Sequence, residues 1–215
     1  MFYFKNVISS VTRYKINLVI KILIISDFLF WSAYQLLGPF FAIFITDNIK
    51  NGGLEAVGIS AAIYLIFKSV FEIPVGIYID RSKVEKDDLY TAFFGTLLMG
   101  FLYFAYIFID SIWQLYLLQA LMGIAAALSY PGWCSIFTRH IDKGKEGFEW
   151  SIYDILSGVG MAAAAALGGF MAQEFGFNFL FILVGIISIF SAFILLFIKN
   201  KIYYCSPKKL VKKKK

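Results

Sequence analysis

The sequence predicts an all-α membrane protein with six transmembrane helices, and its composition is the first reason. Of the 215 residues, 60% are hydrophobic and only 16% are charged, whereas soluble domains carry about 25% charged residues. Such a chain has too few polar side chains to cover a surface that faces water. The second reason is that six stretches each supply the roughly 20 apolar residues that a bilayer requires. These stretches are residues 17–45, 54–79, 89–109, 112–138, 150–175 and 178–198.

The segments between the apolar stretches are short, so we expect a single membrane domain. It comprises residues 17–198 and lies between a cytoplasmic N-terminal segment, residues 1–16, and a basic cytoplasmic tail, residues 199–215. The first apolar stretch is longer than the roughly 7 to 15 residues of a signal-peptide core, so we expect the N-terminus to be retained. The two cysteines, Cys134 and Cys205, lie far apart and suggest neither a disulfide framework nor a metal site.

The distribution of lysine and arginine predicts that both termini lie in the cytoplasm, on the inner side of a cell membrane. Most of the 20 basic residues occur before residue 16, in the segments 80–88 and 139–149, or in the tail. Lys50 stands alone on the opposite side, and positively charged loops stay in the cytoplasm. The lysine-rich tail is also expected to contact anionic lipid headgroups. The alternative is that this charge block is a topology signal alone.

One face of the first stretch combines a carboxylate with aromatic side chains. Asp27, Trp31 and Tyr34 recur at helical spacing, and Gln35 lies at the edge of the same face. Because an ionisable residue inside a bilayer is costly, it faces a cavity or a partner. We interpret Asp27 as a candidate proton carrier and the other three as candidate walls of a solute cavity. The alternative is that Asp27 merely bonds a neighbouring helix. Pro39 lacks a backbone donor and is expected to bend the helix.

The second stretch contains a lysine and a glutamate within the apolar run. Lys68 and Glu72 are four residues apart, so they lie on one helical face and are expected to pair. Burial disfavours the charged form of a carboxyl group and a neighbouring cation favours it, and this balance suits proton coupling. Glu72, with Lys68 beside it, is therefore the second candidate for proton coupling.

The fourth and fifth stretches contribute polar and small residues. Gln119 and Tyr130 follow one face of the fourth stretch and are candidate walls of the solute cavity. Gly158, Gly168 and Gly169 lie in the fifth stretch, where small residues let helix backbones approach closely. We expect these glycines to pack against another helix. The third and sixth stretches carry no internal charge and are expected to face lipid.

The end of the second stretch carries a recognisable motif. A Glu-x-Pro-x-Gly run ends at Gly76, and Asp80 and Arg81 follow four and five residues later. This pattern resembles the signature that follows the second helix in the major facilitator superfamily, with the Glu-x-Pro-x-Gly variant of its efflux members. Lys83 stands where that signature has a glycine.

The resemblance extends over nearly the whole chain and implies the N-terminal half of a facilitator. Such a half consists of two inverted three-helix repeats, with the first, second, fourth and fifth helices nearest the transport path. The resemblance also implies that Gly76, Asp80 and Arg81 form a gate on the cytoplasmic side. A usual facilitator binds its solute between two six-helix halves. We therefore expect a second copy of this chain, or another six-helix partner, to supply the second half.

These observations together predict a secondary transporter of a small solute that works by alternating access as a homodimer. Aromatic and apolar walls with few acids favour a hydrophobic or cationic compound, because a phosphate site would need arginines in the cavity. Asp27 and Glu72 favour proton coupling, and the resemblance implies efflux. The alternative is a non-transporting scaffold or partner subunit that keeps the fold, since fold does not imply function.

Catalysis is not expected from this sequence. Its single histidine, His140, falls in a charged loop beside Arg139, where a solvated histidine is the ordinary interpretation. The sequence has no GxSxG, HExxH or Walker A motif. We expect no cofactor, no metal ion and no nucleic-acid partner.

Overall fold

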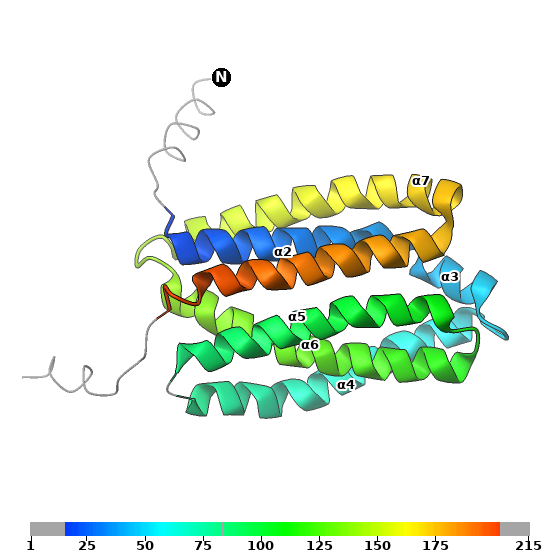
Figure 1. The fold of residues 1–215 in the computed structure, drawn as a ribbon, viewed down its shortest axis with the longest axis horizontal. Coiled ribbons are helices and arrows are strands. Elements are labelled where there is room, and N and C mark those ends of the chain that lie inside the picture. Colours follow the sequence, from blue (N-terminus) through cyan, green and yellow to red (C-terminus); the bar gives the residue numbers. More distant parts are fainter. Residues whose placement is uncertain (1–15, 83, 203–215) are drawn as a thin grey trace, which may run out of the picture.

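The computed structural model describes residues 16–82 and 84–202, and these form a bundle of long helices (Figure 1). The elements are α2 (Leu18–Leu37), η1 (Gly38–Phe40), α3 (Phe41–Asn48), α4 (Leu54–Arg81), α5 (Glu85–Ala105), η2 (Tyr106–Phe108), α6 (Ile112–His140), α7 (Glu146–Leu195) and η3 (Leu196–Ile198). Most of the predicted N-terminal segment and most of the lysine-rich tail lie outside the described residues, and so does the tail's predicted lipid contact.

Five helices in the described ranges are long and apolar enough to cross a membrane. They are Leu18–Asn48, Leu54–Arg81, Glu85–Phe108, Ile112–His140 and Glu146–Ile198. The sequence predicted six, and the difference lies in α7. Gly176 interrupts the helical geometry of α7 with φ 77° and ψ 169°, a conformation that glycine adopts without steric cost. Figure 1 shows α7 folding back on itself, which gives a first arm, residues 146–175, and a second arm, residues 177–195.

Prolines affect the helices differently according to their place. Pro39 lies in η1, and this short 3-10 segment separates α2 from α3. The α-helical ladder is thus interrupted at Pro39, because proline has no N–H to continue it. Pro74 and Pro131 lie inside α4 and α6, and both helices continue past them.

Helix α2 packs between the two arms of α7. On the first arm, a Cβ added at Gly168 would meet the Leu36 carbonyl oxygen at 2.0 Å, so the two backbones are in direct contact. On the second arm, Ser191 is tied to Ser26 by hydrogen bonds that involve both hydroxyl groups, with distances of 2.8 to 3.0 Å. These contacts place α2 and both arms of α7 in one group of helices.

Helix α6 is the centre of a second group, because both α4 and α5 pack on it. A Cβ at Gly123 would meet the Tyr64 carbonyl oxygen of α4 at 2.5 Å, and one at Gly95 would meet the Ser129 nitrogen of α6 at the same distance. The two groups join where α5 packs on the second arm of α7, with Gly100 against Ile189. Two internal hollows lie between α2 of the first group and α4, α5 and α6 of the second.

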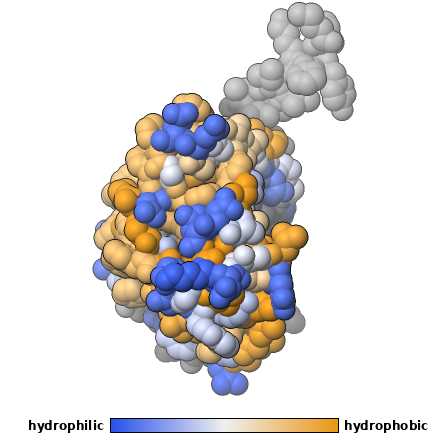
Figure 2. Space-filling model, turned by 90° about the vertical axis from the view of Figure 1, so that its right-hand side faces the viewer, coloured by the Kyte–Doolittle hydropathy of each residue, from blue (hydrophilic) through white to orange (hydrophobic). Residues whose placement is uncertain are grey.

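The bundle has two polar ends. One end, named here the basic end, carries the loops at residues 82–84 and 141–145, and both ends of the described chain lie there (Figure 1). The other end, named the far end, carries the loops at 49–53 and 109–111. Figure 2 views the far end, where hydrophilic residues gather among hydrophobic ones. At the far end, Lys50 Nζ donates to Asp110 Oδ2 at 2.5 Å, which ties the two loops together.

Candidate functional site

Two adjoining hollows lie within the membrane-spanning part of the bundle. The acid hollow has a volume of about 300 Å³ and includes Asp27 and Lys68 in its wall. The tyrosine hollow, of about 370 Å³, lies nearer the far end. The hollows adjoin because they share four wall residues. The shared residues are Tyr34, Tyr64, Tyr103 and Met122. Volumes of this size are in the range of small-molecule sites.

Asp27 projects from α2 into the acid hollow and is held there by two neutral donors. Its Oδ2 accepts hydrogen bonds from the Tyr153 hydroxyl at 2.7 Å and from the Trp31 indole nitrogen at 3.1 Å. Tyr153 belongs to the first arm of α7, so the bond also joins α7 to α2. Both bonds fall on Oδ2, and within the described ranges no donor is recorded for Oδ1. Two bonds thus hold the carboxylate in place, and its Oδ1 accepts no hydrogen bond from the described residues.

The pairing expected between Lys68 and Glu72 is present as a loose ion pair. Lys68 Nζ lies 3.9 Å from Glu72 Oε2, and both side chains are about one-third exposed. The ammonium also lies 5.0 Å from the centre of the Tyr130 ring, a distance at which a cation is attracted to the ring face. Lys68 lines the acid hollow, and Glu72 stands behind it on the same face of α4.

The predicted wall residues divide between the two hollows. Trp31 and Tyr130 line the acid hollow, Gln119 lines the tyrosine hollow, and Tyr34 belongs to both. Gln35 is not part of either wall, and its side chain lies close to Gly38. The α2 face defined by Asp27, Trp31 and Tyr34 therefore faces the hollows together, as helical spacing requires.

The three glycines predicted to pack do not behave alike. Gly168 contacts the backbone of Leu36, and a Cβ at Gly169 would meet the Phe40 ring at 2.9 Å. Gly158 has nothing within 4 Å of a would-be Cβ. No contact in the described bundle therefore accounts for the packing role expected of Gly158.

The charged residues of the motif at the end of α4 face outward in this structure. Asp80 and Arg81 are both exposed, and neither forms an ion pair with a described residue. Gly76 and Asp80 line a shallow hollow of about 400 Å³ at the basic end, together with Arg139 of α6. Among the residues that the structure describes, Asp80 and Arg81 therefore form no ion-pair latch.

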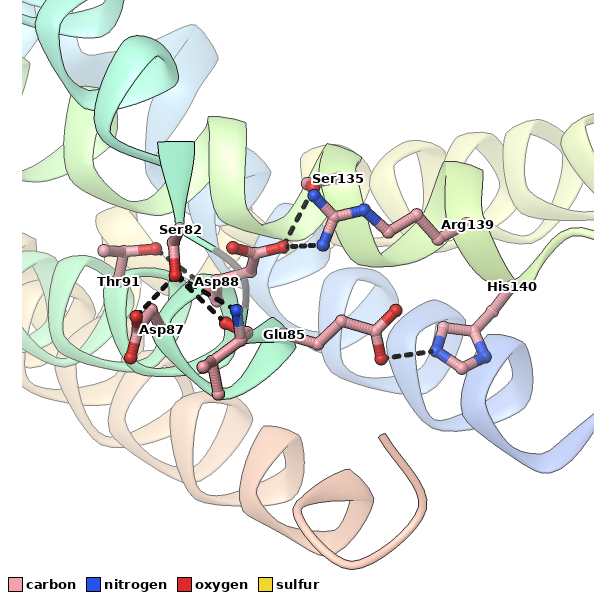
Figure 3. A network of polar contacts seen from close by, with 9 residues as sticks. Ser82, Glu85, Asp87, Asp88, Thr91, Ser135, Arg139 and His140 are labelled. Atoms are coloured by element: carbon pink, nitrogen blue, oxygen red, sulfur yellow. Dashed lines mark hydrogen bonds and ion pairs between the residues drawn. The ribbon is translucent and has the colours of Figure 1, made fainter. Parts of the chain in front are cut away.

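A buried polar network at the basic end joins α5 to α6 instead (Figure 3). Asp88 is fully buried, and its Oδ2 accepts from Arg139 Nη1 at 2.5 Å and from the Ser135 hydroxyl at 2.9 Å. Beside it, His140 Nε2 lies 3.3 Å from Glu85 Oε2. The network fixes the ends of the two helices relative to each other.

The expectation that Arg139 and His140 lie in a solvated loop was wrong. Helix α6 continues to His140, and α5 already begins at Glu85, so both residues belong to helix ends. The missed signal was the placement of charge, because acids favour the first turn of a helix and bases favour the last. Helix α5 begins before the third apolar stretch and carries buried Asp88 in its first turn, while residues 89–109 hold no charged residue.

Several wall residues were not among the sequence candidates. Tyr64, Tyr103 and Trp133 line the hollows, and Trp133 keeps a buried indole N–H without a partner in the described structure. In the same wall, the Thr96 and Ser129 hydroxyls bond each other at 2.8 Å. Tyrosine and tryptophan inside apolar helices were the available signal, because each carries a polar group that needs a partner when buried.

Comparison with known protein families identifies this arrangement. The model of the Major Facilitator Superfamily matches residues 23–213, which is most of the chain. No curated protein matches the chain. Members of the matched family are membrane transporters of small-molecule solutes, which agrees with long apolar helices around internal hollows. The chain belongs to the major facilitator superfamily.

Proposed function

We propose that this protein is a secondary transporter that moves a small solute with an apolar body and a cationic group by alternating access. The observation that carries the proposal is the free Oδ1 of Asp27 in a hollow walled by aromatic side chains. A carboxylate attracts a cation directly, and aromatic ring faces attract it as well. An ionisable residue at this depth marks a transport path in membrane proteins generally.

Coupling to protons follows from competition at Asp27 Oδ1. A proton or a cationic solute can occupy this oxygen, but not both, because each neutralises the same charge. When the solute binds, the proton leaves to water, and when the solute departs, a proton returns. Glu72 is the second acid that can exchange a proton in this way, with Lys68 as its neighbour. Proton movement in one direction then drives solute in the other, which corresponds to efflux.

Each copy of the chain, in this proposal, contributes six spans. The two arms of α7 serve as the fifth and sixth spans, and the six form two inverted three-helix repeats with both termini in the cytoplasm of the cell membrane. Two copies related by a twofold axis along the membrane normal supply the two halves of a facilitator. The gate residues Asp80 and Arg81, which have no ion-pair partner in the described chain, would then act across the dimer.

Open space on two helices supports the dimer. Nothing lies within 4 Å of a would-be Cβ at Gly58 and Gly76 of α4 or at Gly158 of the first arm. Small residues at a helix surface let another helix approach closely in a membrane. In the most apolar window of α4, only 11% is buried within one copy, the lowest value among the five spans. A second copy covering α4 and the first arm would use this space.

Flux in proteoliposomes tests the proposal. The probe is benzyltrimethylammonium, an apolar permanent cation that cannot carry a proton itself, and an imposed pH gradient drives its movement. We expect Asp27→Asn to abolish pH-driven flux and Glu72→Gln to reduce it. Glu174→Gln, at an exposed acid on the first arm, is the matched control and should transport normally. If both Asp27→Asn and Glu72→Gln transport like the unmodified protein, these acids have no role in transport. If the unmodified protein itself shows no flux, a non-transporting partner subunit becomes the better account.

A further inference from the structure

The acid hollow presents a carboxylate oxygen and an ammonium group that make no hydrogen bond to the described residues, although the ammonium has the loose ion pair with Glu72. Asp27 Oδ1 accepts no hydrogen bond from the described residues, and Lys68 Nζ donates none to them. The contact of Lys68 with Glu72, at 3.9 Å, is longer than a hydrogen bond. Both Asp27 and Lys68 are wall residues of this one hollow. A negative acceptor and a positive donor therefore face the same space.

A solute with only a cation would satisfy half of this site. Its charge would be attracted to Asp27 and repelled by Lys68, because like charges in a low-dielectric setting oppose each other strongly. A solute with only an anion would meet the reverse problem. A solute that bears an ammonium and a carboxylate can engage both groups, and it enters the hollow without net charge.

We propose that the solute of this hollow is a small zwitterion with an apolar body. Its ammonium donates to Asp27 Oδ1, its carboxylate accepts from Lys68 Nζ, and its apolar body extends into the tyrosine hollow. This inference rests on the proposed function and names its solute class more narrowly.

The neighbouring walls fit the apolar body. The tyrosine hollow is lined by aliphatic and aromatic side chains, including Leu37, Phe41 and Val57, and it adjoins the acid hollow at the shared tyrosines. A solute with its charged end at Asp27 would thus find apolar surface on the far-end side. The volumes of the two hollows, about 300 and 370 Å³, leave room for a molecule of the size of an aromatic amino acid.

Binding to the full chain in lipid nanodiscs, followed by isothermal titration calorimetry, tests the inference with three related probes. Phenylalanine carries both charges, its methyl ester carries the cation alone, and N-acetylphenylalanine carries the anion alone. We expect phenylalanine to bind about tenfold more tightly than either derivative, because each derivative leaves one charged group of the wall without its partner.

Variants of Lys68 separate its role from a general effect on folding. Lys68→Met keeps the length of the side chain and removes its charge, so phenylalanine affinity should fall about tenfold while ester affinity is kept or improved. Lys68→Arg keeps the charge and should keep the preference for the zwitterion. Lys143→Met, at an exposed loop residue, is the control and should change nothing.

The outcomes distinguish this inference from the proposed function. If the ester binds as tightly as phenylalanine, or if phenylalanine does not bind, the zwitterion inference is wrong. The flux of benzyltrimethylammonium then decides independently whether the protein transports a cationic solute. If phenylalanine is preferred and the preference disappears in Lys68→Met but not in Lys68→Arg, the inference holds.

Discussion

Two aspartates in the bundle differ in what surrounds them, because one has a cationic partner and the other has only neutral donors. Asp88 at the basic end and Asp27 in the acid hollow each accept two hydrogen bonds on Oδ2. Asp88 receives one of its bonds from Arg139, and its Oδ1 is buried without a partner. Asp27 receives both bonds from neutral groups, and its Oδ1 is left to the hollow.

Burial alone therefore does not distinguish the two carboxylates, whereas the charge of their hydrogen-bond partners does. At Asp88 an arginine already neutralises the charge, and no space remains for another cation. At Asp27 the neutral donors Tyr153 and Trp31 orient the carboxylate without neutralising it. Replacing Arg139, the charge partner of Asp88, and Tyr153, a donor to Asp27, tests this distinction.

Loss of the Asp88 partner should have the largest effect on stability. Arg139→Met leaves a fully buried carboxylate without its cation, so we expect a destabilisation of about 3 kcal/mol. Thermal unfolding in detergent, followed by circular dichroism, measures it. Arg81→Met is the control, since Arg81 is exposed and makes no ion pair with the described residues, and it should stay within about 0.5 kcal/mol. Equal stabilities of the two variants would show that the Asp88–Arg139 pair does not hold the ends of α5 and α6 together.

The second-largest loss of stability is expected where the first arm of α7, which carries Tyr153, packs closely on α2. Gly168→Ala places a methyl group 2.0 Å from the Leu36 carbonyl oxygen, so we expect a cost of about 1 to 3 kcal/mol. Gly147→Ala, near the start of α7, has open space and should change stability by no more than about 0.5 kcal/mol. The same unfolding assay compares the pair. A neutral Gly168→Ala would mean that the arm packs on α2 less tightly than the structure has it.

Removing a neutral donor from Asp27 should affect solute handling more than stability. Tyr153→Phe deletes the hydroxyl at 2.7 Å and leaves the ring, so we expect a loss of about 1 kcal/mol in solute binding, or about fivefold in affinity. Concentration-dependent flux of benzyltrimethylammonium reports this as a raised KM. Tyr78→Phe, at an exposed tyrosine of α4, is the control. An unchanged KM in Tyr153→Phe would show that the donor does not orient the carboxylate.

The smallest effect is expected at the surface of the basic end. The Lys145 ammonium donates to Asp142 at 2.8 Å and holds the pKa of that carboxyl below its ordinary value. A lowered folded-state pKa stabilises the protein above the unfolded-state pKa, and this contribution is lost as the pH falls through the folded-state value. Because the pair lies at the surface, Asp142→Asn should leave the melting temperature near pH 7 almost unchanged. A drop of several degrees would show that this pair is more than a surface contact.

Local features of the site could be predicted because they depend on one helix. The spacing of Asp27, Trp31 and Tyr34 decides that they share a face, and the spacing of Lys68 and Glu72 decides that they meet. The boundary expected between the stretches 150–175 and 178–198 also depends on local sequence, and the structure interrupts α7 there, at Gly176.

Contacts between distant parts of the chain could not be predicted in this way. Tyr153 is 126 residues from Asp27 in sequence, and nothing in the local pattern links them. The pairing of Asp88 with Arg139 was missed because the apolar stretches were ended at the first charges, whereas the helices continue into them. Helix packing decides which charges meet, and a single sequence does not contain that information.

Proton release on solute binding tests the central claim about Asp27 most directly. Benzyltrimethylammonium is added to the purified protein in weakly buffered solution, and a pH-sensitive dye records the protons released. The account predicts release of up to one proton per bound cation by the unmodified protein, and none by Asp27→Asn. Equal release by Asp27→Asn, or binding without release by the unmodified protein at every pH from 5 to 8, would contradict the claim that proton and solute compete for this carboxylate.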